Sequence, residues 1–215
     1  MKSFYNGLIK ENAILKLALG LCTALALSNT VESAFVMGLS LLVVLVFSNI
    51  TISLIRNLVP DNVRIPVFIL IIGTFVTILD LVMFNYTRDL HSVLGIYLPL
   101  IVVNCLIMGR ALAVASKSGV VESLKDGLSI GLGFLVTLVI IGVIREFLGN
   151  NSLSIIDNLS VLTGFTLKFE NILPSNNLLP FATFKEPAGA FITMGFLMAF
   201  FKAYVSKKEV KNGTN

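Results

Sequence analysis

Apolar residues gather in six segments along the chain, and polar connections separate them. After a polar arm over residues 1–12, the apolar segments cover residues 13–27, 34–55, 65–84, 91–108, 128–144 and 187–206. A helix crosses the hydrocarbon core of a bilayer with about 20 apolar residues. Four of the six segments are clear spans on this basis. The pattern therefore predicts an all-α membrane protein with six transmembrane segments.

The first and fourth segments are expected to be broken or half-helices. Residues 13–27 contain Lys16 and give roughly 22 Å of helix, against a hydrocarbon core of about 30 Å. The fourth segment contains Pro99 and runs into a stretch of small residues, 109–119. A broken helix at membrane depth is tolerated only inside protein or along a cavity. Both segments are therefore expected to face the interior of a bundle.

Charges in the connections predict the orientation. If the N-terminus is cytoplasmic, the outer connections hold only Arg88, Arg145, Lys168 and Lys185, which leaves 12 of the 16 Lys and Arg residues on the cytoplasmic side. Both termini are then cytoplasmic in a prokaryotic plasma (inner) membrane. The N-terminal arm shows no removable signal peptide. Residues 145–186 are expected to be the longest connection, packed over one face of the bundle.

Composition narrows the class of function. The chain of 215 residues is 56% hydrophobic and only 13% charged, and its mean hydropathy of +0.93 excludes an ordinary soluble fold. No phosphate-binding glycine loop, catalytic triad or zinc-hydrolase spacing is present. Nucleic-acid binding has no support, and membrane lipid is the expected surrounding.

An imperfect internal repeat divides the chain into residues 1–89 and 90–215. Residues 30–40, TVESAFVMGLS, resemble residues 120–129, VVESLKDGLS, and each copy follows a cysteine. Each half contributes three segments, so the second half enters the membrane from the opposite side. The prediction is one membrane domain of two inverted three-helix repeats, in which Cys22 and Cys105 meet near the midplane.

These two cysteines allow two interpretations. A cysteine in a membrane helix often packs as a small apolar side chain. Their equivalence in the repeat gives a metal centre equal weight, although two thiolates are too few ligands for a closed site. Either the site is an open one or a partner's two cysteines complete it, and four thiolates together would hold an iron-sulfur cluster that carries single electrons.

Other polar residues are weaker candidates. Asp80 and His91 lie near segment ends, where solvation explains them. Arg110 and Lys117 either balance the charge of a cluster or mark the cytoplasmic border. Glu32 and Glu122, which the repeat relates, either line an ion path or cap helices.

The chain resembles a known family over nearly its whole length except residues 150–186. The resemblance rests on these stretches: GLCTALALSNTVESAFVMGLS, PDNVRIPVFILIIGTFVTI, LPLIVVNCLIMGRALAVASKSG, DGLSIGLGF and IREFLG. They look like the membrane subunits of the Rnf ion-translocating ferredoxin:NAD oxidoreductase and of the related sodium-pumping NADH:quinone reductase. The match is closest to the E-type subunit of Rnf, which is related to the D-type subunit of the quinone reductase.

The resemblance implies a translocase subunit that is not an enzyme alone. It implies pairing with the homologous six-helix A-type subunit of opposite topology, and each of the two chains donates two cysteines to a shared [2Fe-2S] cluster. The matching positions are Cys22 and Cys105. Electrons would pass to or from flavin-bearing and iron-sulfur subunits, coupled to sodium or proton export.

Three positions depart from the family pattern. Ala13 and Thr23 replace other residues beside Asn12 and Cys22, and Leu112 stands where the family has Glu, which weakens any ion-path role there. The sequence also leaves open a small secondary transporter with structural cysteines, or a structural scaffold for pump partners.

Overall fold

The computed structural model describes residues 19–28, 30–86, 91, 95–150, 153–155, 167–169 and 187–212. This part of the chain is almost entirely helical, as predicted. In chain order the elements are α2 (Leu21–Leu27), α3 (Val31–Ile55), the 3-10 turn η2 (Asp61–Val63), α4 (Arg64–Tyr86), α6 (Pro99–Val102), α7 (Cys105–Arg110), the π-helix η3 (Ala111–Ala115), α8 (Val120–Asn150), β1 (Leu153–Ile155), β2 (Leu167–Phe169) and α10 (Pro187–Asn212). The strands form one short antiparallel ladder, in which Leu153 pairs with Phe169.

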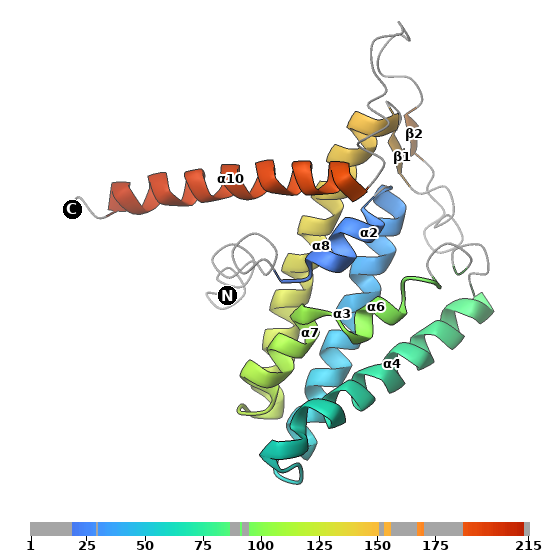
Figure 1. Ribbon diagram of the computed structural model, residues 1–215, viewed down its shortest axis with the longest axis vertical. Helices are drawn as coiled ribbons and strands as arrows, with labels where there is room; N and C mark the ends of the chain where they lie inside the picture. The colour runs from blue at the N-terminus through green and yellow to red at the C-terminus, as the bar shows by residue number, and fades with distance from the viewer. Residues whose placement is uncertain are drawn as a thin grey trace, which may run out of the picture.

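Helices α3 and α8 form the central pair and run antiparallel (Figure 1). Glycines bring their backbones together. A Cβ atom at Gly38 would lie 3.2 Å from Leu135 Cα, and one at Gly142 would lie 3.0 Å from Ala34 Cβ. Small residues at a helix interface permit such close contact in membranes, where van der Waals packing drives association. This pair is the scaffold on which the shorter helices rest.

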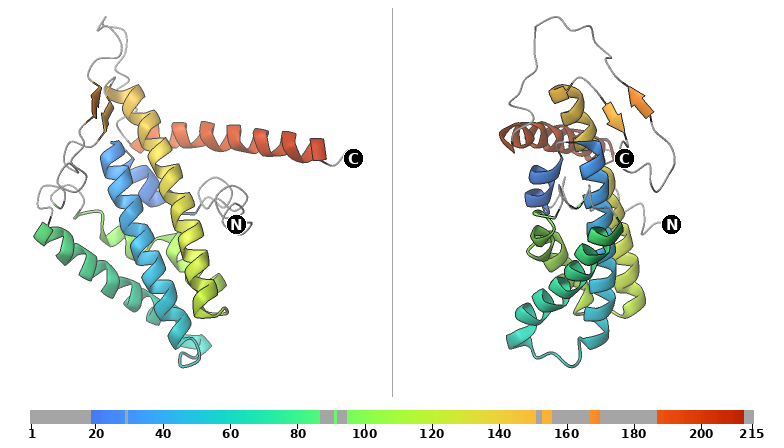
Figure 2. Two further views of the ribbon diagram at one scale, coloured as in Figure 1. Left: turned by 180° about the vertical axis from the view of Figure 1, so that it is seen from behind. Right: turned by 90° about the vertical axis from the view of Figure 1, so that its right-hand side faces the viewer.

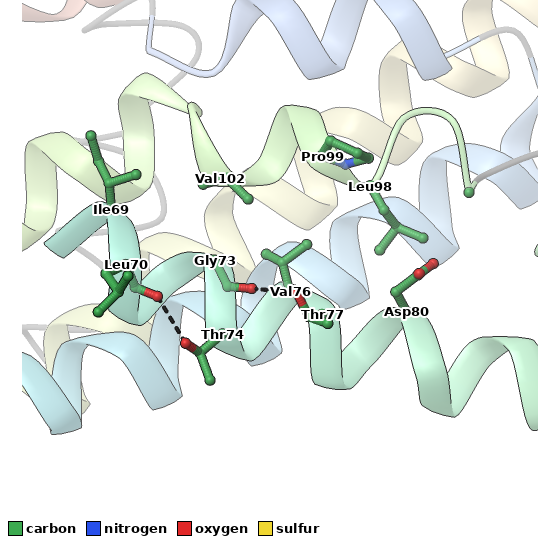
Figure 3. A pocket seen from close by; sticks show the side chains of 11 residues that line it. Ile69, Leu70, Gly73, Thr74, Val76, Thr77, Asp80, Leu98, Pro99 and Val102 are labelled. Atoms are coloured by element: carbon green, nitrogen blue, oxygen red, sulfur yellow. Dashed lines mark hydrogen bonds between the residues drawn. The ribbon is translucent and has the colours of Figure 1, made fainter. Parts of the chain in front are cut away.

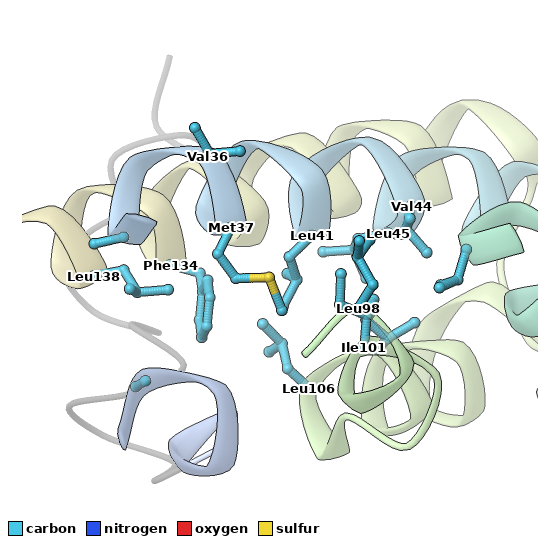
Figure 4. Close-up of a cluster of buried hydrophobic side chains, with 14 of the residues drawn as sticks. Val36, Met37, Leu41, Val44, Leu45, Leu98, Ile101, Leu106, Phe134 and Leu138 are labelled. Carbon is cyan, nitrogen blue, oxygen red and sulfur yellow. The ribbon is translucent and has the colours of Figure 1, made fainter. Parts of the chain in front are cut away.

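The main core lies between this pair and the short helices. Figure 4 shows Met37 and Leu41 of α3 beside Phe134 of α8, with Leu106 of α7 pointing toward them. All four side chains are at most 1% exposed. Helices α2 and α6–α7 therefore lie on one side of the central pair and share a single apolar cluster.

Three of the described helices are long and apolar enough to cross a membrane. They span residues Val31–Ile55, Asp61–Asn85 and Val120–Glu146, and shorter apolar helices cover Pro99–Ala115 and Gly189–Phe200. Large apolar side chains such as Leu54 and Leu70 are 73% and 72% exposed. An outward apolar surface of this kind is what a surrounding of lipid requires.

Two outer helices are less enclosed. Helix α4 leaves the central pair toward its C-terminal end, whereas α10 projects across the axis of the bundle (Figures 1 and 2). Phe196 and Phe200 of α10 are 75% and 76% exposed. The predicted sixth segment is helical but does not run alongside α3 and α8, and six transmembrane segments remain a prediction.

The boundaries correct the sequence-based expectations at two places. Helix α8 begins at Val120 and ends at Asn150, so the predicted span over residues 128–144 is extended at both ends, and Arg145 is helical rather than part of a connection. The predicted break over residues 109–119 is only partly present, because α7 continues directly into η3. The actual break in the fourth segment lies earlier, between α6 and α7. Residues 13–18 of the first segment and most of the 145–186 connection lie outside the described residues.

Candidate metal centre

Cys22 lies in the first turn of a short helix. Helix α2 begins at Leu21 and follows Gly20, whose φ of 82° is in the left-handed region. A Cβ atom at Gly20 would lie 2.6 Å from Phe134 Cε2, so both the backbone angle and the contact require glycine there. The sequence therefore starts α2, and with it Cys22, at a fixed point against α8.

Cys105 also lies in the first turn of a short helix, as the first residue of α7. Helix α6 ends at Val102, and Asn104 then has extended backbone and accepts a hydrogen bond from Leu106 N at its side-chain oxygen. The N–O distance is 2.9 Å. Asn is among the preferred N-cap residues because its side chain satisfies a free amide of the first turn. The sequence prediction of a broken fourth segment is confirmed, with the break directly before the cysteine.

Two hydrogen bonds join these helix starts. Gly20 N–H donates to Cys105 Sγ at 2.9 Å, and Asn104 Nδ2 donates to Thr23 Oγ1 at 3.1 Å. Thr23 in turn donates to Gly20 O. Thr23 and Asn104 are fully buried. The structure thus brings the neighbourhoods of Cys22 and Cys105 together, although they are distant in sequence.

Both cysteines are free thiols and both are exposed on the surface of the chain. No group of three or more His, Cys, Asp or Glu side chains suited to a metal ion occurs within the described residues. The donor set in this part of the chain is therefore two exposed sulfurs. Two sulfurs fit half of a four-thiolate cluster, provided that a second chain supplies the other two.

Of the other charged candidates, Arg110 has an opposite charge as its partner. Arg110 at the end of α7 donates to both carboxylate oxygens of Asp126 on α8, with one N–O distance of 2.9 Å. The backbone carbonyl of Lys117 accepts a hydrogen bond from Arg56 Nη1. Glu32 and Glu122 lie in the first turns of α3 and α8, where acidic side chains are favourable. The helix-start interpretation of the two glutamates therefore agrees with their positions.

Asp80 and His91 form a pair away from the cysteines. His91 Nε2 lies 2.9 Å from Asp80 Oδ1, and the His91 ring meets Phe84 edge-on. Asp80 lies at one end of a groove of about 550 Å³ between α4 and α6, with Val76 and Leu98 in its lining (Figure 3). The hydroxyls of Thr74 and Thr77 bond back to their own helix, so the groove wall is largely apolar.

Sequence reasoning missed the most deeply buried charges. Arg145 and Glu146 of α8 are each 1% exposed, although Arg145 is expected from the sequence in an outer connection. Arg145 Nη1 donates to Ser28 Oγ at 2.7 Å, and Glu146 Oε2 accepts from Val31 N at 2.8 Å. The signal in the sequence is an opposite-charge pair directly after an apolar run that contains glycine.

Comparison with known proteins agrees with this architecture. Residues 1–198 match the family model described as "Rnf-Nqr subunit, membrane protein". The chain belongs to the Rnf-Nqr family of membrane subunits. This confirms the resemblance found in the sequence, and the match includes both cysteine-bearing regions.

Curated members of this family cover almost the whole chain. A protein of Pseudoalteromonas atlantica, named as the E subunit of an ion-translocating oxidoreductase complex, is 43% identical over 96% of this chain and 92% of its own. The protein of that name in Methanosarcina acetivorans is 41% identical over 99% and 95%. A protein of Acetobacterium woodii, named as the E subunit of a Na(+)-translocating ferredoxin:NAD(+) oxidoreductase complex, is 40% identical over 92% and 93%. These names agree with the expectation of a translocase subunit rather than a separate enzyme.

Proposed function

We propose that this chain is the E-type membrane subunit of an ion-translocating ferredoxin:NAD oxidoreductase complex. In this proposal Cys22 and Cys105 supply two of the four thiolate ligands of a [2Fe-2S] cluster. The homologous six-helix A-type subunit, of opposite topology, supplies the other two. Electrons cross the membrane between flavin-bearing and iron-sulfur subunits, and their transfer drives export of sodium or protons.

One observation carries the proposal: the hydrogen bond from Gly20 N–H to Cys105 Sγ at 2.9 Å. It joins the start of one cysteine-bearing helix to the sulfur that begins the other. Hydrogen bonds to the ligand sulfurs are among the features with which proteins adjust iron-sulfur clusters. The exposure of both cysteines supports completion of the site by a second chain.

The group that these residues would hold supplies reversible one-electron transfer when bound. The protein's part in this proposal is to hold the two sulfurs near each other and to direct the Gly20 amide at Cys105. Asn104 holds Leu106 N in the first turn of α7, and its link to Thr23 holds α2 in register with α7. An apolar core lies behind both helices.

The inverted repeat and the six-span topology are part of the same proposal. The matched stretches of the repeat coincide with the starts of α3 and α8, which run antiparallel, and each follows a cysteine-bearing short helix. Two three-helix halves that insert into the membrane in opposite directions would make these two helices antiparallel in this way. The charge bias then places both termini in the cytoplasm of a prokaryotic cell.

The test is EPR and visible absorption of the whole complex, purified with wild-type chain, Cys22→Ser or Cys105→Ser. The proposal expects that either variant loses one [2Fe-2S] signal and also loses about two iron atoms per complex. Thr51→Val is the matched control, because its hydroxyl bonds back to Phe47 O of its own helix. Unchanged iron content and unchanged ion transport in the double cysteine variant would instead identify a transporter with structural cysteines.

A further inference from the structure

Two adjacent opposite charges lie buried where α8 meets the tight turn between α2 and α3. Arg145 and Glu146 are each 1% exposed. An ion removed from water costs several kcal/mol unless polar groups compensate it. Two such residues side by side in an apolar span therefore need a structural or functional reason.

Each charge meets the helix end that suits its sign. Arg145 Nη1 donates to Ser28 Oγ, and Ser28 donates to Ala24 O in the last turn of α2. Glu146 Oε2 accepts from Val31 N, the first residue of α3, at 2.8 Å. Cations are stabilised at helix C-termini and anions at N-termini. The pair thus binds the end of α2 and the start of α3.

Close packing one turn earlier in α8 makes this contact possible. A Cβ atom at Gly142 would lie 3.0 Å from Ala34 Cβ, 3.4 Å from Val31 Cα and 3.5 Å from Thr30 O. A larger residue at position 142 would push α8 away from the start of α3. Gly142 therefore lets the two charges reach the turn.

The position of α2 depends on this contact at one end. Helix α2 has seven residues, Leu21–Leu27, and is only about 10 Å long. So short a helix is expected to shift as a rigid unit. Cys22 lies in its first turn, and Ala24 and Ser28 lie toward the end that Arg145 holds. Thr23 and Gly20 hold the other end to α7. A shift at Ser28 is therefore transmitted to the sulfur.

We propose that Arg145 and Glu146 are positioning residues, which hold α2 from its C-terminal end so that Cys22 faces the same site as Cys105. The inference rests on the proposed function, because it assigns these two charges to the geometry of the cysteine pair. Neither residue touches the sulfurs. They act through the α2–α3 turn.

The experiment measures this geometry without iron. The whole complex in membranes is stripped of iron with a chelator and reductant, and a short bis-thiosulfonate reagent then cross-links Cys22 to Cys105 within one chain. Arg145→Gln and Glu146→Gln are expected to lower the cross-linked fraction at least about fivefold, since a displacement near 1 Å strongly slows reactions between positioned groups. Arg145→Lys should recover part of it, because it keeps the charge but loses the planar fork.

The control and the outcomes separate the two claims. Arg56→Gln removes an arginine that donates to the Lys117 carbonyl at the opposite end of α3, so it should leave cross-linking unchanged. If the Arg145→Gln chain fails to accumulate in the membrane, Glu146→Gln and Arg145→Lys test the positioning role instead, because both variants retain hydrogen-bonding groups. If these variants cross-link as efficiently as the wild-type chain, the positioning role is overturned and the cluster proposal stays intact. No cross-linking in the wild-type chain, together with no iron in the complex, overturns both.

Discussion

Breaking the link between Asn104 and Thr23 tests the geometry of the paired helix starts. Asn104→Ala removes the N-cap of α7 and the hydrogen bond of Asn104 Nδ2 to Thr23 Oγ1. Loss of a cap costs about 1 kcal/mol, and loss of a buried hydrogen bond costs about 1 kcal/mol more. We therefore expect the free energy of unfolding to fall by about 2 kcal/mol.

Thr23→Val removes the hydrogen bond between Asn104 and Thr23 but leaves the N-cap of α7 in place. The methyl group keeps the volume of the hydroxyl, but Asn104 Nδ2 is left buried without this acceptor. The expected cost is about 1–2 kcal/mol, and the double variant should cost less than the sum by about 1 kcal/mol, which is the coupling energy of the pair. Unfolding by SDS in mixed micelles, followed by circular dichroism, measures all four states.

A matched threonine gives the baseline for this cycle. Thr77 is exposed and its hydroxyl donates to Gly73 O of its own helix. Thr77→Val should change the free energy of unfolding by less than about 0.5 kcal/mol. Strict additivity of Asn104→Ala and Thr23→Val would refute the reasoning, because it would mean that the two side chains do not hold each other.

Three further predictions concern packing and buried polar groups. Gly20→Ala forces a left-handed alanine against Phe134 and should cost about 2 kcal/mol or more; wild-type maleimide labelling rates at both cysteines and an unchanged SDS midpoint would contradict it. Arg110→Gln leaves Asp126 unpaired at a place where both side chains are at most 16% exposed, so the free energy of unfolding should fall by about 2 kcal/mol. The double variant Arg110→Gln with Asp126→Asn should recover part of this loss in the same assay. Asn49 is fully buried, and its two side-chain polar atoms have no hydrogen-bond partner within the described residues. Asn49→Leu should therefore raise the SDS midpoint, by about 1 kcal/mol in free energy; a lower midpoint would show that the amide has a partner in the membrane.

The long helices could be predicted from the sequence because runs of apolar residues show them directly. Helices α3 and α4 begin and end within a few residues of the predicted segments. The broken fourth segment could also be predicted, since Pro99 lies inside an apolar run. The position of the break could not, because it depends on Asn104, whose side chain caps α7 and reaches Thr23 across the fold.

The buried charges could not be placed by hydropathy alone. Arg145 ends an apolar run and is followed by Glu146, which is also how a connection at the membrane border begins. What distinguishes them is a tertiary contact, because each residue bonds a helix end from the first part of the chain. A single hydropathy profile contains no information about such distant partners. The proximity of the regions around Cys22 and Cys105, by contrast, could be predicted because the repeat relates them.

The short length of α2 has a consequence for how the chain enters the membrane during synthesis. The groups that hold α2 in place, on Asn104, Phe134 and Arg145, are all translated long after it. A seven-residue helix is marginal on its own. While the ribosome is still making the second half, α2 can pack against α3 of the first half, but its contacts with Asn104, Phe134 and Arg145 form only after α8 has left the insertion machinery. Maturation of the thiol pair is therefore a late event in biogenesis.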